Sequence, residues 1–220
     1  MRFAILIIGA YLLGSIPFGL LIAKAHGKDL RSIGSGNIGA TNLSRVLGRK
    51  WAYFCFCLDT LKGLAPMLVA IKSISSQPGT VELGLSLAVG CAAVLGHIFP
   101  IYIKFRGGKG VATSFGVALG LWPYYTICSL LSFGVWTAVV LMWRYISLAS
   151  IAASVAFPVA FALAIVLIPA WNFANLWPLF ITAVAIPLMV IVRHRENIKR
   201  ILAGTEERIL KDKPRAHQNQ

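Results

Sequence analysis

Residues 145–192 decide the fold class, and they read YISLASIAASVAFPVAFALAIVLIPAWNFANLWPLFITAVAIPLMVIV. None of these 48 residues is Asp, Glu, Lys or Arg. Because a helix needs about 20 apolar residues to cross the hydrocarbon core of a bilayer, the stretch predicts two membrane-spanning helices. Segment 169–178, which contains two prolines and two tryptophans, predicts the turn between them.

A second charge-free stretch, residues 110–143, covers 34 positions. At a rise of about 1.5 Å per residue, one helix of that length is too long for a single crossing. We therefore expect a break at the aromatic residues Trp122–Tyr125. With three further apolar runs, the predicted spans are 3–23, 51–71, 83–103, 110–122, 125–143, 146–168 and 176–192.

Composition excludes an ordinary soluble domain. Apolar residues make up 58% of the chain and charged residues 13%, against roughly 25% charged in a typical globular domain. Mean hydropathy is +0.77. The four cysteines lie inside apolar runs without metal-ligand spacing, which favours small buried hydrophobic side chains. The sequence predicts one all-α polytopic membrane domain over residues 1–220.

The positive charge is clustered rather than spread. The formal net charge of +14 would by itself suggest nucleic acid. However, 18 of the 21 Lys and Arg residues fall in four regions, namely 24–50, 104–109, Arg144 and 193–215. Seven crossings place all four on one side, and basic loops are typically cytoplasmic. We therefore expect seven transmembrane helices, an N-terminus outside and a cytoplasmic C-terminus.

The first of three polar segments on that side is the loop 25–49, which contains GSGNIGATNLSR at 34–45. Small residues let backbone approach a ligand, and an arginine presents a fork that suits phosphate or carboxylate. The alternative interpretation is a flexible Gly/Ser linker. The candidate residues here are Ser35, Asn37, Gly39, Thr41, Asn42 and Arg45.

The second segment, 104–110, continues into a helix start as FRGGKGVATS at 105–114. Glycine N–H groups, a helix N-terminus and a lysine together suit an anion. The alternative is a basic turn at the membrane surface. The candidates are Gly107, Gly108, Lys109, Gly110 and Thr113.

The third segment, 193–220, begins RHRENIKRILAG. On a helix, His194 and Asn197 share a face, although an amphipathic basic helix on anionic lipid is the alternative. His97 and Ser147 are expected at the same membrane level. Within the second span, Asp59 and Lys62 lie three residues apart and are expected to pair with each other.

Several motifs together closely resemble the bacterial acyl-phosphate:glycerol-3-phosphate acyltransferase family. They are GSIPFG at 14–19, GSGNIGATN at 34–42, FRGGKGVAT at 105–113, and RHREN at 193–197 with Gly204 and Glu206. The resemblance implies a membrane-integral enzyme that transfers an acyl group from acyl phosphate to the sn-1 hydroxyl of glycerol 3-phosphate. The products would be lysophosphatidate and phosphate, in the first step of bacterial phospholipid synthesis.

The resemblance also implies location and partners. The protein would be multi-pass in the bacterial inner membrane, with its active site on the cytoplasmic face. It would use no cofactor or metal and bind no nucleic acid. Contact with the soluble enzyme that makes acyl phosphate would agree with this location. The alternative function is a transporter or channel for a phosphorylated anion, although transporters place binding groups near the midplane.

Two sets of residues carry the expected chemistry. The predicted catalytic residues are Ser35, Arg45, Lys109, Ser147, His194 and Asn197. The predicted substrate- and phosphate-binding residues are Asn37, Gly39, Thr41, Asn42, His97, Gly107, Gly108, Gly110 and Thr113. Because acyl phosphate is already reactive, direct attack without an acyl-enzyme is preferred. The base is either His194 or a substrate phosphate, and we favour the phosphate.

Overall fold

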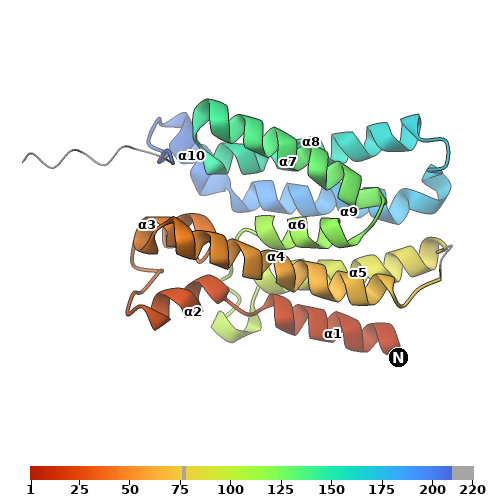
Figure 1. Ribbon diagram of the computed structural model, residues 1–220, viewed down its shortest axis with the longest axis horizontal. Coiled ribbons are helices and arrows are strands. Elements are labelled where there is room, and N and C mark those ends of the chain that lie inside the picture. The colour runs from red at the N-terminus through yellow and green to blue at the C-terminus, as the bar shows by residue number, and fades with distance from the viewer. Residues whose placement is uncertain (76–77, 210–220) are drawn as a thin grey trace, which may run out of the picture.

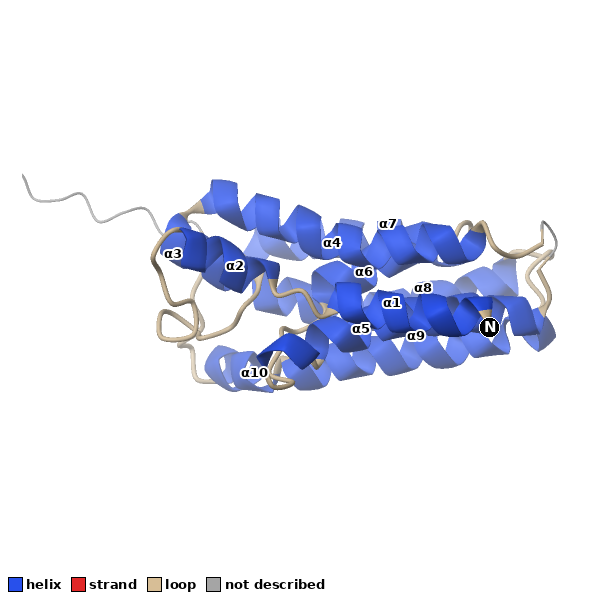
Figure 2. Cartoon of the chain, turned by 90° about the horizontal axis from the view of Figure 1, so that it is seen from below, coloured by secondary structure: helices blue, strands red, loops and turns tan. Residues whose placement is uncertain are grey.

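The computed structural model describes residues 1–75 and 78–209, and every regular element in these ranges is helical. The elements form an elongated bundle with the N-terminus at one end and α3 and α10 at the other (Figures 1 and 2). They are α1 (Arg2–Gly14), α2 (Phe18–Ala25), α3 (Ala40–Leu47), α4 (Arg49–Ile71), α5 (Thr80–Ile98), η1 (Ile101–Ile103), α6 (Val111–Gly120), α7 (Tyr124–Trp143), α8 (Ile146–Leu167), α9 (Phe173–Arg193) and α10 (Arg195–Leu202).

The all-helical class is confirmed, and six segments are long and apolar enough to cross a membrane. These are Arg2–Ala25, Arg49–Ile71, Thr80–Ile103, Tyr124–Trp143, Ile146–Leu167 and Phe173–Arg193. Both charge-free stretches are interrupted, because α7 begins after Pro123 and residues 168–172 separate α8 from α9. The second break is shorter than the predicted segment 169–178, because residues 173–178 belong to α9. The last 11 residues of the predicted segment 193–220 lie outside the described residues.

The predicted span 110–122, already short at 13 residues, is three residues shorter in the structure. It corresponds to α6, whose ten residues measure about 15 Å, roughly half of a 30 Å hydrocarbon core. Gly110 has a left-handed φ of 88° and precedes the helix, while Leu121 terminates it. Counting uncharged residues overestimates this helix because Gly110 before it and Leu121–Trp122 after it are uncharged but not helical. A count of seven spans therefore stays a prediction.

The first predicted span, 3–23, is broken rather than continuous. α1 ends at Gly14 and α2 begins at Phe18, after Pro17. Proline lacks an N–H and disrupts a helix at its N-terminal side, which leaves carbonyl groups without helical partners. In this break, the Ile16 carbonyl oxygen accepts the Phe18 N–H at 3.1 Å and the Lys62 ammonium at 2.8 Å.

Asp59 and Lys62 pair with each other, as predicted. The Lys62 Nζ lies 2.8 Å from the Asp59 Oδ1, and both side chains are buried. An ionisable group in a membrane segment is costly unless it is paired. The pair on α4 therefore lets a buried cation hold the break between α1 and α2.

Glycines bring the helices close together. α1 packs mainly against α5, and α4 packs mainly against α6. A Cβ atom at Gly96 would collide with the Tyr11 carbonyl oxygen, and one at Gly63 would collide with the Thr113 carbonyl oxygen. Small residues at such crossings are the usual means of packing membrane helices, where hydrophobic driving force between helices is absent.

We predict that Gly96→Ala lowers the free energy of unfolding by about 1–3 kcal/mol, the usual cost of overpacking. Gly84→Ala in the same helix is the matched control, because no atom lies within 4 Å of its added Cβ. The control should be neutral or slightly stabilising, since alanine favours a helix over glycine. Thermal unfolding in detergent measures both, and equal behaviour of the two variants would contradict the assigned packing.

Candidate functional site

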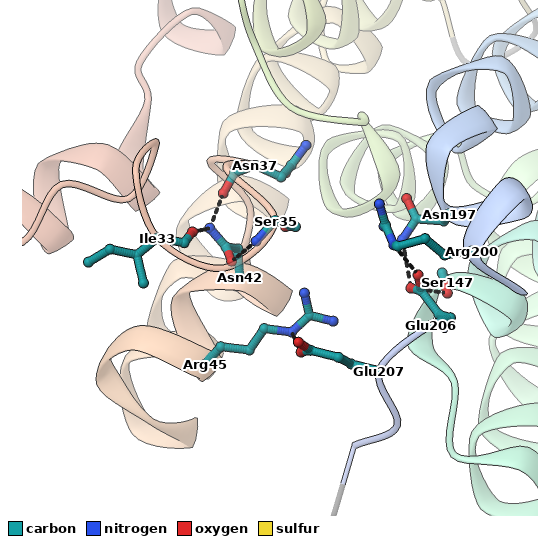
Figure 3. A network of polar contacts seen from close by, with 10 residues as sticks. All are labelled: Ile33, Ser35, Asn37, Asn42, Arg45, Ser147, Asn197, Arg200, Glu206 and Glu207. Atoms are coloured by element: carbon teal, nitrogen blue, oxygen red, sulfur yellow. Dashed lines mark hydrogen bonds and ion pairs between the residues drawn. The ribbon is translucent and has the colours of Figure 1, made fainter. Parts of the chain in front are cut away.

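The three polar segments found in the sequence meet at one end of the bundle, opposite the N-terminus (Figures 1 and 2). They are part of the predicted loop 25–49, the turn 104–110 between α5 and α6, and the α9–α10 junction. The prediction of one loop over 25–49 is wrong in its second half, because only residues 26–39 form a loop and Ala40–Leu47 form α3. In Figure 3, Asn42 and Arg45 lie on one side, and Asn197 and Glu206 lie on the facing side.

Asn42 organises the first loop. Its amide nitrogen lies 3.0 Å from the carbonyl oxygens of Leu30, Ile33 and Asn37. Its Oδ1 accepts the Ser35 N–H at 2.9 Å (Figure 3). The residue is only 1% exposed, and its polar atoms are engaged within the loop. Asn42 thus shapes the loop, and this geometry does not support the predicted direct contact with a substrate.

The start of α3 leaves other candidates accessible. The Gly39 N–H donates to the Asn37 Oδ1 at 2.9 Å, directly before the helix. Ser35 is exposed and Thr41 is half-buried in the first helical turn. Within the described ranges, neither hydroxyl makes a hydrogen bond. Ser35 remains a predicted catalytic residue, and Thr41 remains a predicted substrate-binding residue.

The glycine turn corrects one expectation. The Gly107 N–H donates to the Ile98 carbonyl at 3.2 Å, and the Gly108 N–H donates to the His97 carbonyl at 3.1 Å. These two N–H groups therefore do not converge on an anion, as the sequence had suggested. They close the C-terminal end of α5 instead, which leaves an anion only the groups that follow them.

Packing explains the glycines at both positions. A Cβ at Gly107 would collide with the His97 carbonyl oxygen, and one at Gly108 would collide with the His97 Nε2. The Arg193 guanidinium donates to both glycine carbonyls, at 3.2 and 3.3 Å. His97 itself is buried, with its Nδ1 3.7 Å from the Asp59 Oδ1. His97 therefore lies beneath the turn.

The N-terminus of α6 retains the features that suit an anion. Gly110 adopts a left-handed conformation directly before the helix. Within the described ranges, the N–H groups of Val111 and Ala112 donate to no backbone carbonyl. Thr113 is fully buried, and its hydroxyl has no partner in the same ranges. Unpaired N–H groups at a helix start attract negative charge.

Lys109, Asn197 and Glu206 form a chain with fixed polarity. The Lys109 Nζ donates to the Asn197 Oδ1 at 2.5 Å. The Asn197 Nδ2 donates to the Glu206 Oε1 at 2.7 Å. An ammonium group can only donate and a carboxylate can only accept. The asparagine amide is therefore oriented by its two charged neighbours, and it joins the start of α6 to α10.

Glu206 gathers further donors. Its Oε1 also accepts the Ser147 hydroxyl at 2.7 Å, and its Oε2 accepts the Arg200 Nε at 2.7 Å (Figure 3). Since the Ser147 hydrogen is used here, Ser147 supports the carboxylate in this arrangement. The sequence prediction named neither Glu206 nor Arg200 as a site residue. Glu206 was detectable as one of only seven acidic residues in a strongly basic chain.

The surroundings set the charges of the site. Burial lowers the pKa of Lys109 to about 8. The positive charges of nearby arginines also lower this pKa, whereas the negative charge of Glu206 raises it. Burial and the charge of Lys109 lower the pKa of His194 to about 4. Burial alone would raise the pKa of Glu206, but its hydrogen bonds outweigh this and hold it below the ordinary value. At pH 7, Lys109 is charged and His194 is neutral.

His194 lies between the last two helices. Its Nδ1 is 2.8 Å from the Val190 carbonyl oxygen, and the residue is 2% exposed. Because a carbonyl only accepts, the neutral ring carries its hydrogen on Nδ1 and leaves Nε2 as an acceptor. Asn197 is also buried, as expected for a face that both residues share.

Arg45 connects the first segment to the third. Its Nε lies 2.7 Å from the Glu207 Oε2 (Figure 3). Glu207 immediately follows the carboxylate that holds Asn197 and Ser147. The site thus combines two cationic groups from separate segments, a helix N-terminus and a buried polar network.

Comparisons with known proteins point to one family. A profile described as glycerol-3-phosphate acyltransferase matches residues 4–204. A glycerol-3-phosphate acyltransferase of Aquifex aeolicus is 44% identical over 94% of this chain and 100% of its own. Another, of Geotalea daltonii, is 46% identical over 92% and 95%.

Solved structures agree with the sequence relatives. The crystal structure of PlsY (YgiH), an integral membrane glycerol 3-phosphate acyltransferase, in the glycerol 3-phosphate form has a TM-score of 0.83 and 42% identity, covering 96% of both chains. Its lysophosphatidic acid form has a TM-score of 0.80 and 41% identity, covering 94% of this chain and 95% of that one. Fold and sequence therefore identify the same family of glycerol 3-phosphate acyltransferases.

We predict that Asn197→Asp destabilises the protein by about 1–3 kcal/mol, because it replaces a donor to Glu206 with a carboxylate. Adding Glu206→Gln should recover part of the loss, since the new amide can donate to the new carboxylate. Asn175→Asp, at an exposed position of α9, is the control and should be nearly neutral. Thermal unfolding decides, and a neutral Asn197→Asp would refute the assigned polarity.

Proposed function

Because the chain belongs to the glycerol-3-phosphate acyltransferase family, and is thus an acyltransferase of lipid biosynthesis, we propose the full reaction. The chain transfers an acyl group from acyl phosphate to the sn-1 hydroxyl of glycerol 3-phosphate. The products are lysophosphatidate and inorganic phosphate. The observation that carries this proposal is that Arg45 and Lys109, which precedes the α6 N-terminus, are joined through adjacent carboxylates: Arg45 pairs with Glu207, and Lys109 is linked through Asn197 to Glu206.

We also propose that the site faces the cytoplasm of a bacterial inner membrane, with seven crossings and an external N-terminus. The clustering of basic residues at the α3 and α10 end of the bundle supports this orientation. α6 would supply the short crossing, completed by the turns on either side of it. Single cysteines at exposed positions 72 and 203 should then label from opposite sides of the membrane.

Two phosphate groups must be held for this reaction. Arg45 offers a planar fork to one phosphate. Lys109 and the free N–H groups of Val111 and Ala112 offer a point charge and a helix dipole to another. These groups also stabilise the negative charge that develops as the hydroxyl oxygen attacks the acyl carbonyl.

The transfer is proposed as a single displacement. The sn-1 oxygen bonds to the acyl carbon, the bond from that carbon to the phosphate oxygen breaks, and phosphate leaves with its electron pair. The hydroxyl proton passes to a base. The cysteines Cys55, Cys57, Cys91 and Cys128 lie within α4, α5 and α7, and none is among the residues of the site. Direct attack is therefore preferred over a thioester intermediate.

A substrate phosphate is the base that the charges favour. With a pKa of about 4, His194 is a weak base at neutral pH. The second ionisation of a phosphate ester lies at roughly 6, and the cationic groups hold that phosphate beside the hydroxyl. We propose that the neutral His194 accepts a hydrogen bond through Nε2 and orients the acceptor substrate.

The direct test is turnover by the purified chain in detergent, supplied with acyl phosphate and glycerol 3-phosphate. Formation of lysophosphatidate with release of phosphate supports the proposal. A transporter would instead move a phosphorylated anion across vesicles without forming a product. The polar groups gather at one end of the bundle rather than at its middle, which favours the enzyme.

We predict that kcat/KM falls as pH rises through about 8, because Lys109 then loses its proton. The lowered pKa means that the charged form is present below this pH and is lost above it. Lys109→Arg should keep measurable activity and lack this alkaline limb, since a guanidinium stays charged. A pH–rate profile with the same alkaline limb in both proteins would show that another group is responsible.

We predict that His194→Gln recovers most of the activity lost in His194→Ala. Glutamine keeps a side chain that can hydrogen-bond but cannot accept a proton at neutral pH. Initial rates at saturating substrates make the comparison. If both variants are equally inactive although both substrates bind, His194 is the base and the substrate phosphate is not.

A further inference from the structure

Glu207 faces the cation that the proposed reaction assigns to a phosphate. Its Oε2 lies 2.7 Å from the Arg45 Nε, so a carboxylate of this chain already sits on the guanidinium fork. Carboxylate and phosphate use the same donors of arginine. Any phosphate that binds Arg45 must therefore either displace Glu207 or accept a second negative charge beside it.

The neighbours of Glu207 hold it in place. Glu206 is anchored by three side-chain donors. On the other side, the Arg208 Nε donates to the Tyr145 hydroxyl at 3.0 Å, and the Ile209 N–H donates to the Arg144 carbonyl at 2.8 Å. Because both flanking residues are fastened, little further backbone ordering is needed to present Glu207 to Arg45.

The ion pair between Arg45 and Glu207 is exposed enough to separate at little cost. The Glu207 side chain is 65% exposed, whereas that of Arg45 is 25% exposed. A carboxylate so open to water regains its hydration when the pair separates, and exposed ion pairs contribute little stability. The two partners also come from different parts of the chain, α3 and the segment after α10 (Figure 3).

We propose that Glu207 is a built-in competitor for the phosphate group of a substrate at Arg45, and that it sets the affinity of the site for phosphate. The inference rests on the proposed function for the identity of the phosphate-bearing substrate. Glu207 pairs with Arg45 between turnovers. A phosphate monoester then displaces Glu207 from Arg45, because it carries more negative charge and more acceptor oxygens than a carboxylate. Glu207 thereby raises the KM of that substrate.

The test compares Glu207→Gln with the unsubstituted full chain in detergent, using inorganic phosphate as the probe in calorimetric titrations. Removing the competing charge should tighten phosphate binding about two- to fivefold, the range expected for an exposed ion pair. Glu196→Gln is the matched control. Glu196 is likewise an exposed carboxylate, but it pairs with Arg195 and Lys199 instead of Arg45.

Tighter phosphate binding in Glu207→Gln and not in Glu196→Gln supports the proposal. Unchanged or weaker binding in Glu207→Gln overturns it, and so does equal tightening in both variants, because the effect would then come from net charge alone. Weaker binding would mean that Glu207 positions Arg45 for phosphate rather than competing with it.

Steady-state kinetics identify the substrate involved. The KM of glycerol 3-phosphate or of acyl phosphate should fall by a similar factor in Glu207→Gln, and if neither falls the proposal is overturned. If the unsubstituted chain shows no turnover, the proposed function fails by itself. The phosphate titration still decides the role of Glu207, so the two failures are distinguishable.

Discussion

The structure depends on one constraint, which is that backbone polar groups freed inside an apolar bundle must find partners within the protein. Two breaks in the helices meet this constraint in the same way. The Ile16 carbonyl, which lies in the break before Pro17, accepts the Lys62 ammonium in addition to the Phe18 N–H. The carbonyls of the glycine turn accept the Arg193 guanidinium. In both cases a cation from another helix bonds to non-helical carbonyl groups, so the irregular segments are fixed in position.

The same constraint changes the meaning of the glycines in the second segment. Glycines before a helix suggest an anion-binding turn, and that interpretation fits Gly110 and the α6 N-terminus. It does not fit Gly107 and Gly108, whose N–H groups close α5 and whose missing side chains leave room for His97. A sequence pattern shows that glycine is required, but the reason depends on which backbone groups are already bonded.

Much of the fold could be predicted from hydrophobicity, because long charge-free stretches and aromatic turns identify helices and their breaks. The errors arose where uncharged residues do not form a helix. This happens at Pro17, which separates α1 from α2, and at the two ends of α6. The three polar segments lie at one end of the bundle, although part of the predicted loop 25–49 is the helix α3. The Asp59–Lys62 pair was expected from its spacing. The partners of Asn197 were not predictable, since they join residues 88 apart to a carboxylate on the segment after α10.

The fixed polarity of the Lys109–Asn197–Glu206 chain has a consequence for evolution. One amide serves a cation through its oxygen and an anion through its nitrogen, so no single partner can change its charge without leaving a mismatch at the other end. Substitutions at these three positions should therefore be correlated among related sequences. A lineage that loses the cation is expected to change the asparagine with it, because the asparagine oxygen then loses its donor. Such correlated change would distinguish a coupled set of residues from three separately conserved ones.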